Sequence, residues 1–230
     1  MEILYQDDDI LVINKPAGLP TLPDGYDPSL PYAKNILEAQ YGRLLTVHRL
    51  DKQTSGVLIF ARTVAAHRSL NTQFERHQVA KIYHALVLGS PGWQERTIDL
   101  PLRPNGDRRH RTVVDLAGGK PAVTLVKVLE RFDPCCLLEA IPQTGRTHQI
   151  RAHLFSMGLA ILGDNLYVIP DSDFPGPGNL PGSLIEGMAL HARSLEIIHP
   201  ISSLKMIFEA PYPSGWEETL QHLRHSGHPA

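Results

Sequence analysis

The sequence predicts an α+β fold, with a largely antiparallel mixed β-sheet and flanking helices and loops. Apolar runs of strand length outnumber helical patterns, and the two do not alternate along the chain as they do in parallel α/β proteins. Hydrophobic residues make up 42% of the chain and charged residues 20%, which is the composition of an ordinary globular protein. Because no internal repeat or linker interrupts the 230 residues, we expect one domain over 1–230.

The N-terminal third shows a hairpin, a long loop, a buried strand and a helix. Apolar residues on both sides of the acidic turn Asp7–Asp9 predict the hairpin. Segment 14–28 contains Pro16, Pro20, Pro23 and Pro28 and predicts a loop. The run GVLIFA at 56–61 predicts a buried strand, and Thr63 can then cap a helix. The apolar face of that helix recurs every four residues, at Ala66, Leu70 and Phe74.

The remainder of the chain adds strands and two helices. Strands are predicted at 79–89, 122–132, 135–141, 188–198 and 204–211. Thr147 is a candidate N-cap for a helix that presents Ile150, Leu154 and Met157 on one face and stops at Gly158. A short helix is predicted at 216–223, and the composition of 167–183 predicts a loop.

Several classes of protein are disfavoured. No apolar run approaches the roughly 18 residues that a membrane span needs, and the N-terminus lacks the charge pattern of a signal peptide. We therefore expect a cytoplasmic protein. Cys135 and Cys136 are too few for a disulfide framework or a structural zinc site, so we expect buried thiols. The net charge of −2 does not by itself point to a nucleic-acid partner.

Positive charge is nevertheless concentrated in one segment, 103–112, whose Pro, Asn and Gly residues mark a loop. Its charged residues are Asp107 and the arginines Arg103, Arg108, Arg109 and Arg111. Either this loop is a solvated surface, or it binds an anion.

Two further segments combine polar residues in an unusual way. HRLDKQTSGVLIFA, at 48–61, places Asp51 directly after a histidine, an arginine and a leucine. In QTGRTHQIRAHLFSMGLAILGDNLY, at 143–167, Arg146 lies at the predicted start of a helix. Free backbone amides and the helix dipole favour an anion there, which suits a carboxylate or a phosphate.

With DDDILVINKPAGLP and KIYHALVLG, these segments resemble the RluA class of RNA pseudouridine synthases, over roughly residues 3–211. The resemblance implies a pseudouridine synthase catalytic fold with a central active-site cleft. It implies an isomerase that converts uridine in RNA to its carbon-linked isomer, with Asp51 as the essential catalytic group. We expect no cofactor, because the isomerisation needs no net redox change or energy input, and no metal, because the sequence lacks metal-ligand spacing. Because the matching segments begin almost at Met1, we expect a short form without an N-terminal RNA-binding module. We also expect the protein to act as a monomer.

The resemblance also implies roles for other residues. Tyr83 is expected against the target base, Arg146 is expected to pair with Asp51, and Arg49 is expected near the space vacated by the flipped nucleotide. The loop containing Arg103, Arg108, Arg109 and Arg111 is expected to grip the substrate. Lys15, in NKPAG, either touches a phosphate or orders its own loop.

The residue types suit this chemistry. Isomerisation breaks the glycosidic bond, turns the uracil and rejoins it through carbon, without net redox change. A carboxylate can act as a nucleophile or can remove a sugar proton, and the sequence leaves both routes open. Since burial disfavours an unpaired charge, a guanidinium is a natural partner for that carboxylate. The expected partner is structured ribosomal or transfer RNA, from which the base is extruded at a cost of a few kcal/mol.

Two alternatives come from other classes. A metal-dependent hydrolase is suggested by His48, His148, His153, His191 and Asp164. However, His148 and His153 are five residues apart, whereas a metal shared on a helix requires a spacing of three or four. An RNA-binding or chaperone module could use the same cleft without catalysis, but the intact set of Asp51, Tyr83 and Arg146 argues against it.

Overall fold

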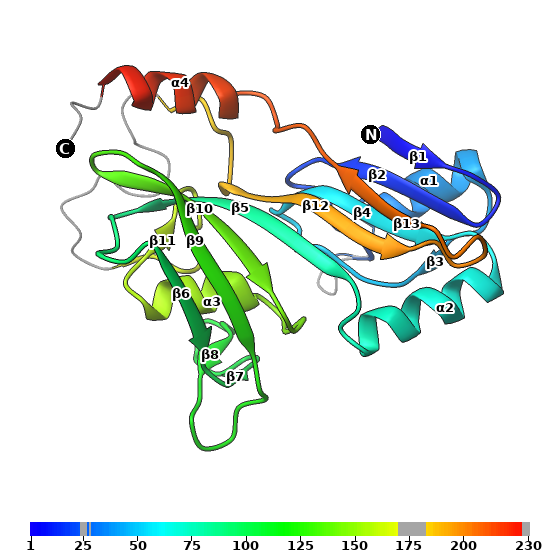
Figure 1. The fold of residues 1–230 in the computed structure, drawn as a ribbon, viewed down its shortest axis with the longest axis horizontal. Helices are drawn as coiled ribbons and strands as arrows, with labels where there is room; N and C mark the ends of the chain where they lie inside the picture. Colours follow the sequence, from blue (N-terminus) through cyan, green and yellow to red (C-terminus); the bar gives the residue numbers. More distant parts are fainter. Residues whose placement is uncertain (24–26, 28, 170–182, 227–230) are drawn as a thin grey trace. The chain divides into compact units, whose positions relative to one another are not determined.

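The computed structural model describes residues 1–23, 27, 29–169 and 183–226, and the chain divides into two compact units. Unit 1 comprises Met1–Lys81 and His191–Pro211, and unit 2 comprises Ile82–Leu190 and Tyr212–Ala230. Each unit combines helices with mostly antiparallel strands (Figure 1), so the predicted fold class is confirmed. Much of the predicted loop 167–183, namely 170–182, lies outside the described residues.

Unit 1 is organised around the predicted N-terminal hairpin. Its strands pair in the order β1 (Glu2–Gln6), β2 (Ile10–Lys15), β4 (Ser55–Ala61), β12 (Leu190–Ile198) and β13 (Lys205–Glu209), with the short β3 (Leu45–Thr46) on β4. The pairing of β4 with β12 is parallel, and the other pairings are antiparallel. Every residue of β4 is buried, as the continuous apolar run predicts.

Two helices accompany this sheet. α2 (Val64–Glu75) begins where predicted, because the Thr63 hydroxyl accepts a hydrogen bond from the Ala66 amide at 3.1 Å. It packs on β3 and β4 and buries Ala66 and Leu70 (Figure 1). α1 (Ala33–Tyr41) was not predicted; it buries only Ala33 and Leu37 and therefore has a weak sequence pattern.

Unit 2 contains the other predicted strands and several short ones. Its strands pair antiparallel in the order β5 (Ala80–Leu88), β10 (Cys135–Pro142), β9 (Val123–Arg131) and β6 (Glu95–Asp99), with β11 (Ala160–Ile161) on β5. A separate ribbon joins β7 (Leu102–Arg103) to β8 (Val113–Val114). Cys135 and Cys136 are buried as expected, and burial raises the pKa of each thiol to about 12.

The helices of unit 2 are α3 (Gln149–Ser156) and α4 (Trp216–Ser226). The predicted N-cap of α3 at Thr147 is wrong. His148 occupies the cap position with a left-handed backbone, φ 52°, and its side chain forms no capping hydrogen bond. The amide of Arg146 is instead satisfied by the Gln149 side chain. The predicted stop is confirmed, because Gly158 follows the helix with φ 75°.

Within the described residues, no helix is long and apolar enough to cross a membrane.

Candidate active site

Asp51 lies in unit 1, on the loop that leads into β4. The side chain is half-buried, and its backbone carbonyl accepts a hydrogen bond from the Thr54 amide at 3.1 Å. Gly56 follows with φ 108°, and a Cβ atom there would lie 2.2 Å from the Ala192 carbonyl oxygen. The TSG sequence after Asp51 is therefore explained by a turn and by close contact of the β4 and β12 backbones.

Lys15, the last residue of β2, lies beneath this loop. Its side chain is 0% exposed, and Nζ donates to the carbonyls of Pro16 at 2.9 Å, Leu19 at 2.8 Å and Lys52 at 3.3 Å. Burial lowers the pKa of Lys15 to about 7, and the charge of the Asp51 carboxylate opposes this lowering. The three carbonyl partners favour the loop-ordering role of Lys15 over contact with RNA phosphate.

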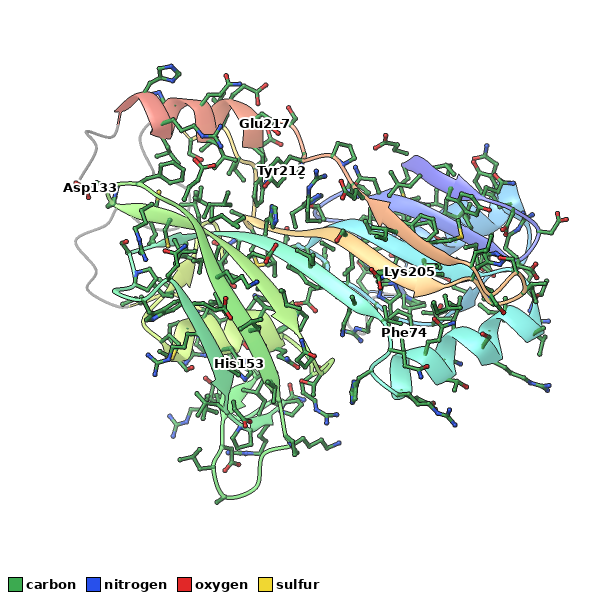
Figure 2. All side chains as sticks on the ribbon, viewed as in Figure 1. Phe74, Asp133, His153, Lys205, Tyr212 and Glu217 are labelled. Carbon is green, nitrogen blue, oxygen red and sulfur yellow. The ribbon has the colours of Figure 1, made fainter. Side chains whose placement is uncertain are left out.

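Arg49 and His48, which precede Asp51, lie in different environments. Arg49 is exposed, which is compatible with a contact to RNA. His48 stacks on Phe74 (labelled in Figure 2), with ring centroids 4.8 Å apart, and its Nε2 accepts from the Ile59 amide at 3.1 Å. Burial lowers the pKa of His48 to about 3, and Lys81 acts in the same direction. His48 is therefore a neutral residue that fixes the start of the loop on β4.

A buried hydrogen-bonded pair, Ser55 and His191, holds the start of β4. The Ser55 hydroxyl and Nδ1 of His191 lie 2.9 Å apart, and both side chains are buried. Nε2 of His191 lies 3.3 Å from the Ala210 carbonyl oxygen. His191 thus connects three segments of unit 1, a role that the sequence pattern did not reveal.

Unit 2 carries the other two residues expected at the active site. Tyr83 pairs in register with Ala140 of β10, and its half-buried side chain packs against the core of this unit. Arg146 lies on the turn before α3, is half-buried, and donates from Nε to the Pro121 carbonyl at 3.0 Å. That Arg146 pairs with Asp51 stays a prediction, because the two residues belong to different units.

Gln149 holds the turn that carries Arg146. Its side-chain oxygen accepts from the Arg146 amide at 3.0 Å and from the Thr144 hydroxyl at 2.6 Å. Its side-chain nitrogen donates to the Val123 carbonyl at 2.9 Å, which joins the turn to β9. Sequence reasoning missed Gln149; the available signal was a glutamine three residues after Arg146, at the position of a capping-box side chain.

The arginine-rich loop connects β7 to β8 and is organised by two carboxylates. Asp107 accepts the amides of Arg109 and Arg111 at 3.0 Å and the Arg111 Nε at 2.6 Å. Asp115 accepts Arg103 Nε at 2.6 Å. The hydrogen bonds from Arg111 lower the pKa of Asp107, and those from the Gly118 amide and Arg103 lower that of Asp115.

The four arginines therefore divide into two pairs. Arg103 and Arg111 form ion pairs inside the loop, although the Arg103 side chain is 52% exposed, and Arg108 and Arg109 are exposed as well. Arg109 also donates to the Asn165 carbonyl at 3.3 Å. Arg108 and Arg109 are the more suitable for contact with a phosphate, because the guanidinium groups of Arg103 and Arg111 are already bound by carboxylates.

A buried ion pair anchors this loop to α3. Arg151 donates to both carboxylate oxygens of Asp164, at 2.7 and 2.8 Å, and lies 5.0 Å from the centre of the Tyr167 ring. The Tyr167 hydroxyl accepts from the Thr112 amide at 2.9 Å and donates to the Thr112 carbonyl at 3.1 Å. Burial is the largest influence on the pKa of Asp164 and would raise it, but the hydrogen bonds and charge of Arg151, together with the amides of Leu166 and Tyr167, hold that pKa below its usual value.

The residues that suggested a metal-dependent hydrolase have protein partners. Nδ1 of His153 (labelled in Figure 2) lies 2.8 Å from the Thr124 hydroxyl, and Asp164 is bound by Arg151. Among the residues that the structure describes, no group of three or more His, Cys, Asp and Glu side chains could hold a metal ion.

Known proteins resemble this chain over most of its length. An uncharacterised RNA pseudouridine synthase of Synechocystis is 40% identical over 97% of this chain and 69% of its own. The dual-specificity RNA pseudouridine synthase RluA of Escherichia coli is 39% identical over 91% of this chain and 92% of its own. The ribosomal large subunit pseudouridine synthase D of Nitrosomonas europaea is 36% identical over 99% of this chain and 67% of its own.

Solved structures agree with these relatives. Human RNA pseudouridylate synthase domain containing 4 aligns with a TM-score of 0.78 and 28% identity, covering 97% of this chain and 93% of its own. Residues 9–156 match the family model described as RNA pseudouridylate synthase. Because this match covers more than half of the chain and the Escherichia coli relative is 39% identical over 92% of its own length, the chain belongs to the RNA pseudouridylate synthase family.

Proposed function

We propose that this chain, an isomerase that converts uridine in RNA to pseudouridine, uses Asp51 as its catalytic carboxylate. The observation that carries the proposal is the setting of Asp51. The residue lies on a turn closed by the hydrogen bond from the Thr54 amide to its carbonyl, and the buried Lys15 binds the carbonyl of the next residue, Lys52. A catalytic group on a rigid support reacts faster, because its geometry is established before the substrate arrives.

The reaction can follow either of two routes. In the first, Asp51 attacks the sugar or the base as a nucleophile, and the bond it forms breaks again before the product leaves. In the second, Asp51 removes a sugar proton so that a transient glycal forms, and the same proton returns to the sugar when the new bond is made. In both, the bond from C1′ to N1 breaks, the uracil turns, a bond from C1′ to C5 forms, C5 loses its proton and N1 gains one. In the proposal, Arg146 serves as the cationic partner of Asp51, and Tyr83 stacks on the extruded base, as the family resemblance implies.

The substrate class that we propose is structured ribosomal or transfer RNA. The name of the Nitrosomonas relative refers to the large ribosomal subunit, and that of the Escherichia coli relative to dual specificity. The exposed Arg49, Arg108 and Arg109 would contact phosphates, while Arg103 and Arg111 keep the loop ordered through Asp115 and Asp107.

The test replaces Asp51 by asparagine and by alanine. Because C5 loses its proton, turnover can be followed as tritium released from ribosomal and transfer RNA transcripts that contain 5-tritiated uridine. We expect both variants to lose isomerisation while they keep their fold and much of their RNA affinity. Asp8→Asn, which removes an exposed carboxylate from the same unit, is the matched control and should keep full activity.

Retention of even about a tenth of wild-type turnover by either Asp51 variant would contradict the assignment, because removal of an essential group costs far more than tenfold. Sequencing the same transcripts for pseudouridine identifies which RNA and which uridine the enzyme modifies.

A further inference from the structure

Thr21 is a buried threonine in the proline-rich loop after β2, and its hydroxyl is bonded to the residue that precedes Asp51. The hydroxyl donates to the Leu50 carbonyl at 3.0 Å and accepts from the Leu50 amide at 3.2 Å. Thr21 is 3% exposed and Leu50 is 4% exposed, so water does not compete for these bonds. One side chain therefore satisfies both backbone groups of Leu50 and restrains its two backbone dihedral angles.

Thr21 is itself fixed by the start of α1. The carbonyl of Pro20 accepts from the Ala33 amide at 2.8 Å, and that of Thr21 accepts from the Lys34 amide at 3.3 Å. Helices begin with amides that have no partner within the helix, and here the loop supplies the acceptors. The Thr21 hydroxyl is consequently attached to a rigid element and not to a free loop.

The other side of Asp51 is held in a similar way, because Lys15 donates to the Lys52 carbonyl. The backbone is thus restrained on both sides of Asp51 by side chains from the segment 15–21. Asp51 has its own carbonyl bonded to Thr54, which completes the turn.

We propose that Thr21 is a positioning residue for isomerisation, in that its hydroxyl sets the backbone angle from which the Asp51 carboxylate is presented to the nucleotide. The proposal rests on the catalytic role of Asp51 given above. Loss of the hydroxyl leaves a buried amide and a buried carbonyl without partners, and the loop must move to reach water. A displacement of about 1 Å at a catalytic group can cost about 100-fold in rate.

The experiment compares Thr21→Val, which keeps the shape and removes the hydroxyl, with Thr21→Ser, which keeps the hydroxyl. Rates are measured in a single turnover with saturating enzyme, and RNA affinity is measured separately. We expect Thr21→Val to slow the reaction by roughly 10- to 100-fold with RNA affinity changed less than about threefold. Thr21→Ser should restore the rate to within about threefold of wild type, because a serine hydroxyl offers the same donor and acceptor.

The chain provides a matched control in Gln73, which clamps a different residue of the same unit. Its amide donates to the Ile198 carbonyl at 2.8 Å and accepts from the Ile198 amide at 2.9 Å. Gln73→Leu removes a clamp with the same hydrogen-bond pattern, held on Ile198, which is 42% exposed, so it should lower the melting temperature less than Thr21→Val does and leave the single-turnover rate unchanged. An equal slowing by Gln73→Leu, or an unchanged rate in Thr21→Val, would overturn the positioning role.

Two further outcomes also decide the proposal: a Thr21→Val variant that does not fold, and an active Asp51→Asn variant. If Thr21→Val does not fold, Thr21→Cys, with its weaker donor and acceptor, is measured in its place, and a wild-type rate or a second failure to fold overturns the proposal. If Asp51→Asn proves active, the catalytic assignment fails, whatever Thr21→Val shows. An inactive Asp51→Asn with a fast Thr21→Val contradicts the role of Thr21 alone.

Discussion

The segments proposed for catalysis and the loop proposed for RNA binding are held by different kinds of interaction. The Asp51 turn is held by the neutral Thr21 on one side and by the buried Lys15 on the other, and the Arg146 turn is held by the neutral Gln149, and all three side chains are nearly fully buried. The arginine-rich loop is instead organised by the carboxylates of Asp107 and Asp115, which are 25% and 20% exposed.

This difference has a physical reason. Buried neutral hydrogen bonds are insensitive to ionic strength, so they keep a geometry constant while a polyanion approaches. Partly exposed ion pairs are weaker and more screened than buried ones, and a phosphate can compete with a carboxylate for the same guanidinium. A catalytic segment needs a geometry that stays constant as the RNA binds. A loop that adapts to a folded RNA benefits from ion pairs that a phosphate can replace.

The buried ion pair beneath the arginine-rich loop should show the largest effect. Asp164→Asn leaves the Arg151 charge buried without a charged partner, and we expect a loss of about 3–5 kcal/mol in the free energy of unfolding. The measurement is urea unfolding at pH 7. Glu130→Gln breaks the more exposed pair with Arg224 in the same unit and should cost at most about 1 kcal/mol.

The ion pair of Arg151 with Asp164 also predicts that the free energy of unfolding depends on pH. The folded-state pKa of Asp164 is lowered relative to the unfolded value of about 3.9, so its contribution is complete above that value and is lost as the pH falls through the folded pKa. The stability difference between wild type and Asp164→Asn should therefore shrink below about pH 4. A difference under about 1 kcal/mol at pH 7 would show that the pair is not the anchor of the loop.

Arg146→Ala tests the catalytic side of the comparison. Because Arg146 is the proposed cationic partner of the Asp51 carboxylate, we expect its loss to lower the single-turnover rate by about 100-fold or more, with a much smaller change in RNA affinity. Arg131→Ala is the control, because Arg131 in the same unit also donates to backbone carbonyls, those of Pro91 and Trp93. If affinity alone fell, Arg146 would be reassigned to contact with phosphate.

The smallest effect concerns the exposed arginines. Each lost phosphate contact flattens the dependence of log affinity on log salt by about 0.7 to 0.9, so Arg108→Ala with Arg109→Ala should reduce the slope by about 1.5. Arg111→Ala should reduce it less, because that guanidinium is paired with Asp107. The double variant of Arg68 and Arg76, two exposed arginines of unit 1, serves as the control. An unchanged slope would mean that the loop is a solvated surface and that RNA lies elsewhere.

Elements with strong local patterns were predictable from sequence. The β4 run is apolar throughout, and α2 has both a threonine cap and a four-residue repeat, so each is specified by residues that are neighbours in the chain. α1 was missed because only Ala33 and Leu37 are buried and because its first amides are satisfied by carbonyls 13 residues earlier, at Pro20 and Thr21. The N-cap of α3 was predicted at Thr147 but lies at His148, and the Gln149 side chain binds the backbone amide of Arg146 ahead of the helix.

The sequence by itself determined the family, the α+β class and the candidates Asp51, Tyr83 and Arg146, because these depend on residue types in a fixed order. Only the tertiary structure decided how Lys15, Thr21 and Gln149 are used. The residue type alone does not tell whether a lysine, a threonine or a glutamine lies on the surface or in the core. Their roles follow from burial beside backbone groups that are distant in the chain, where an unmade hydrogen bond costs more than it does in water.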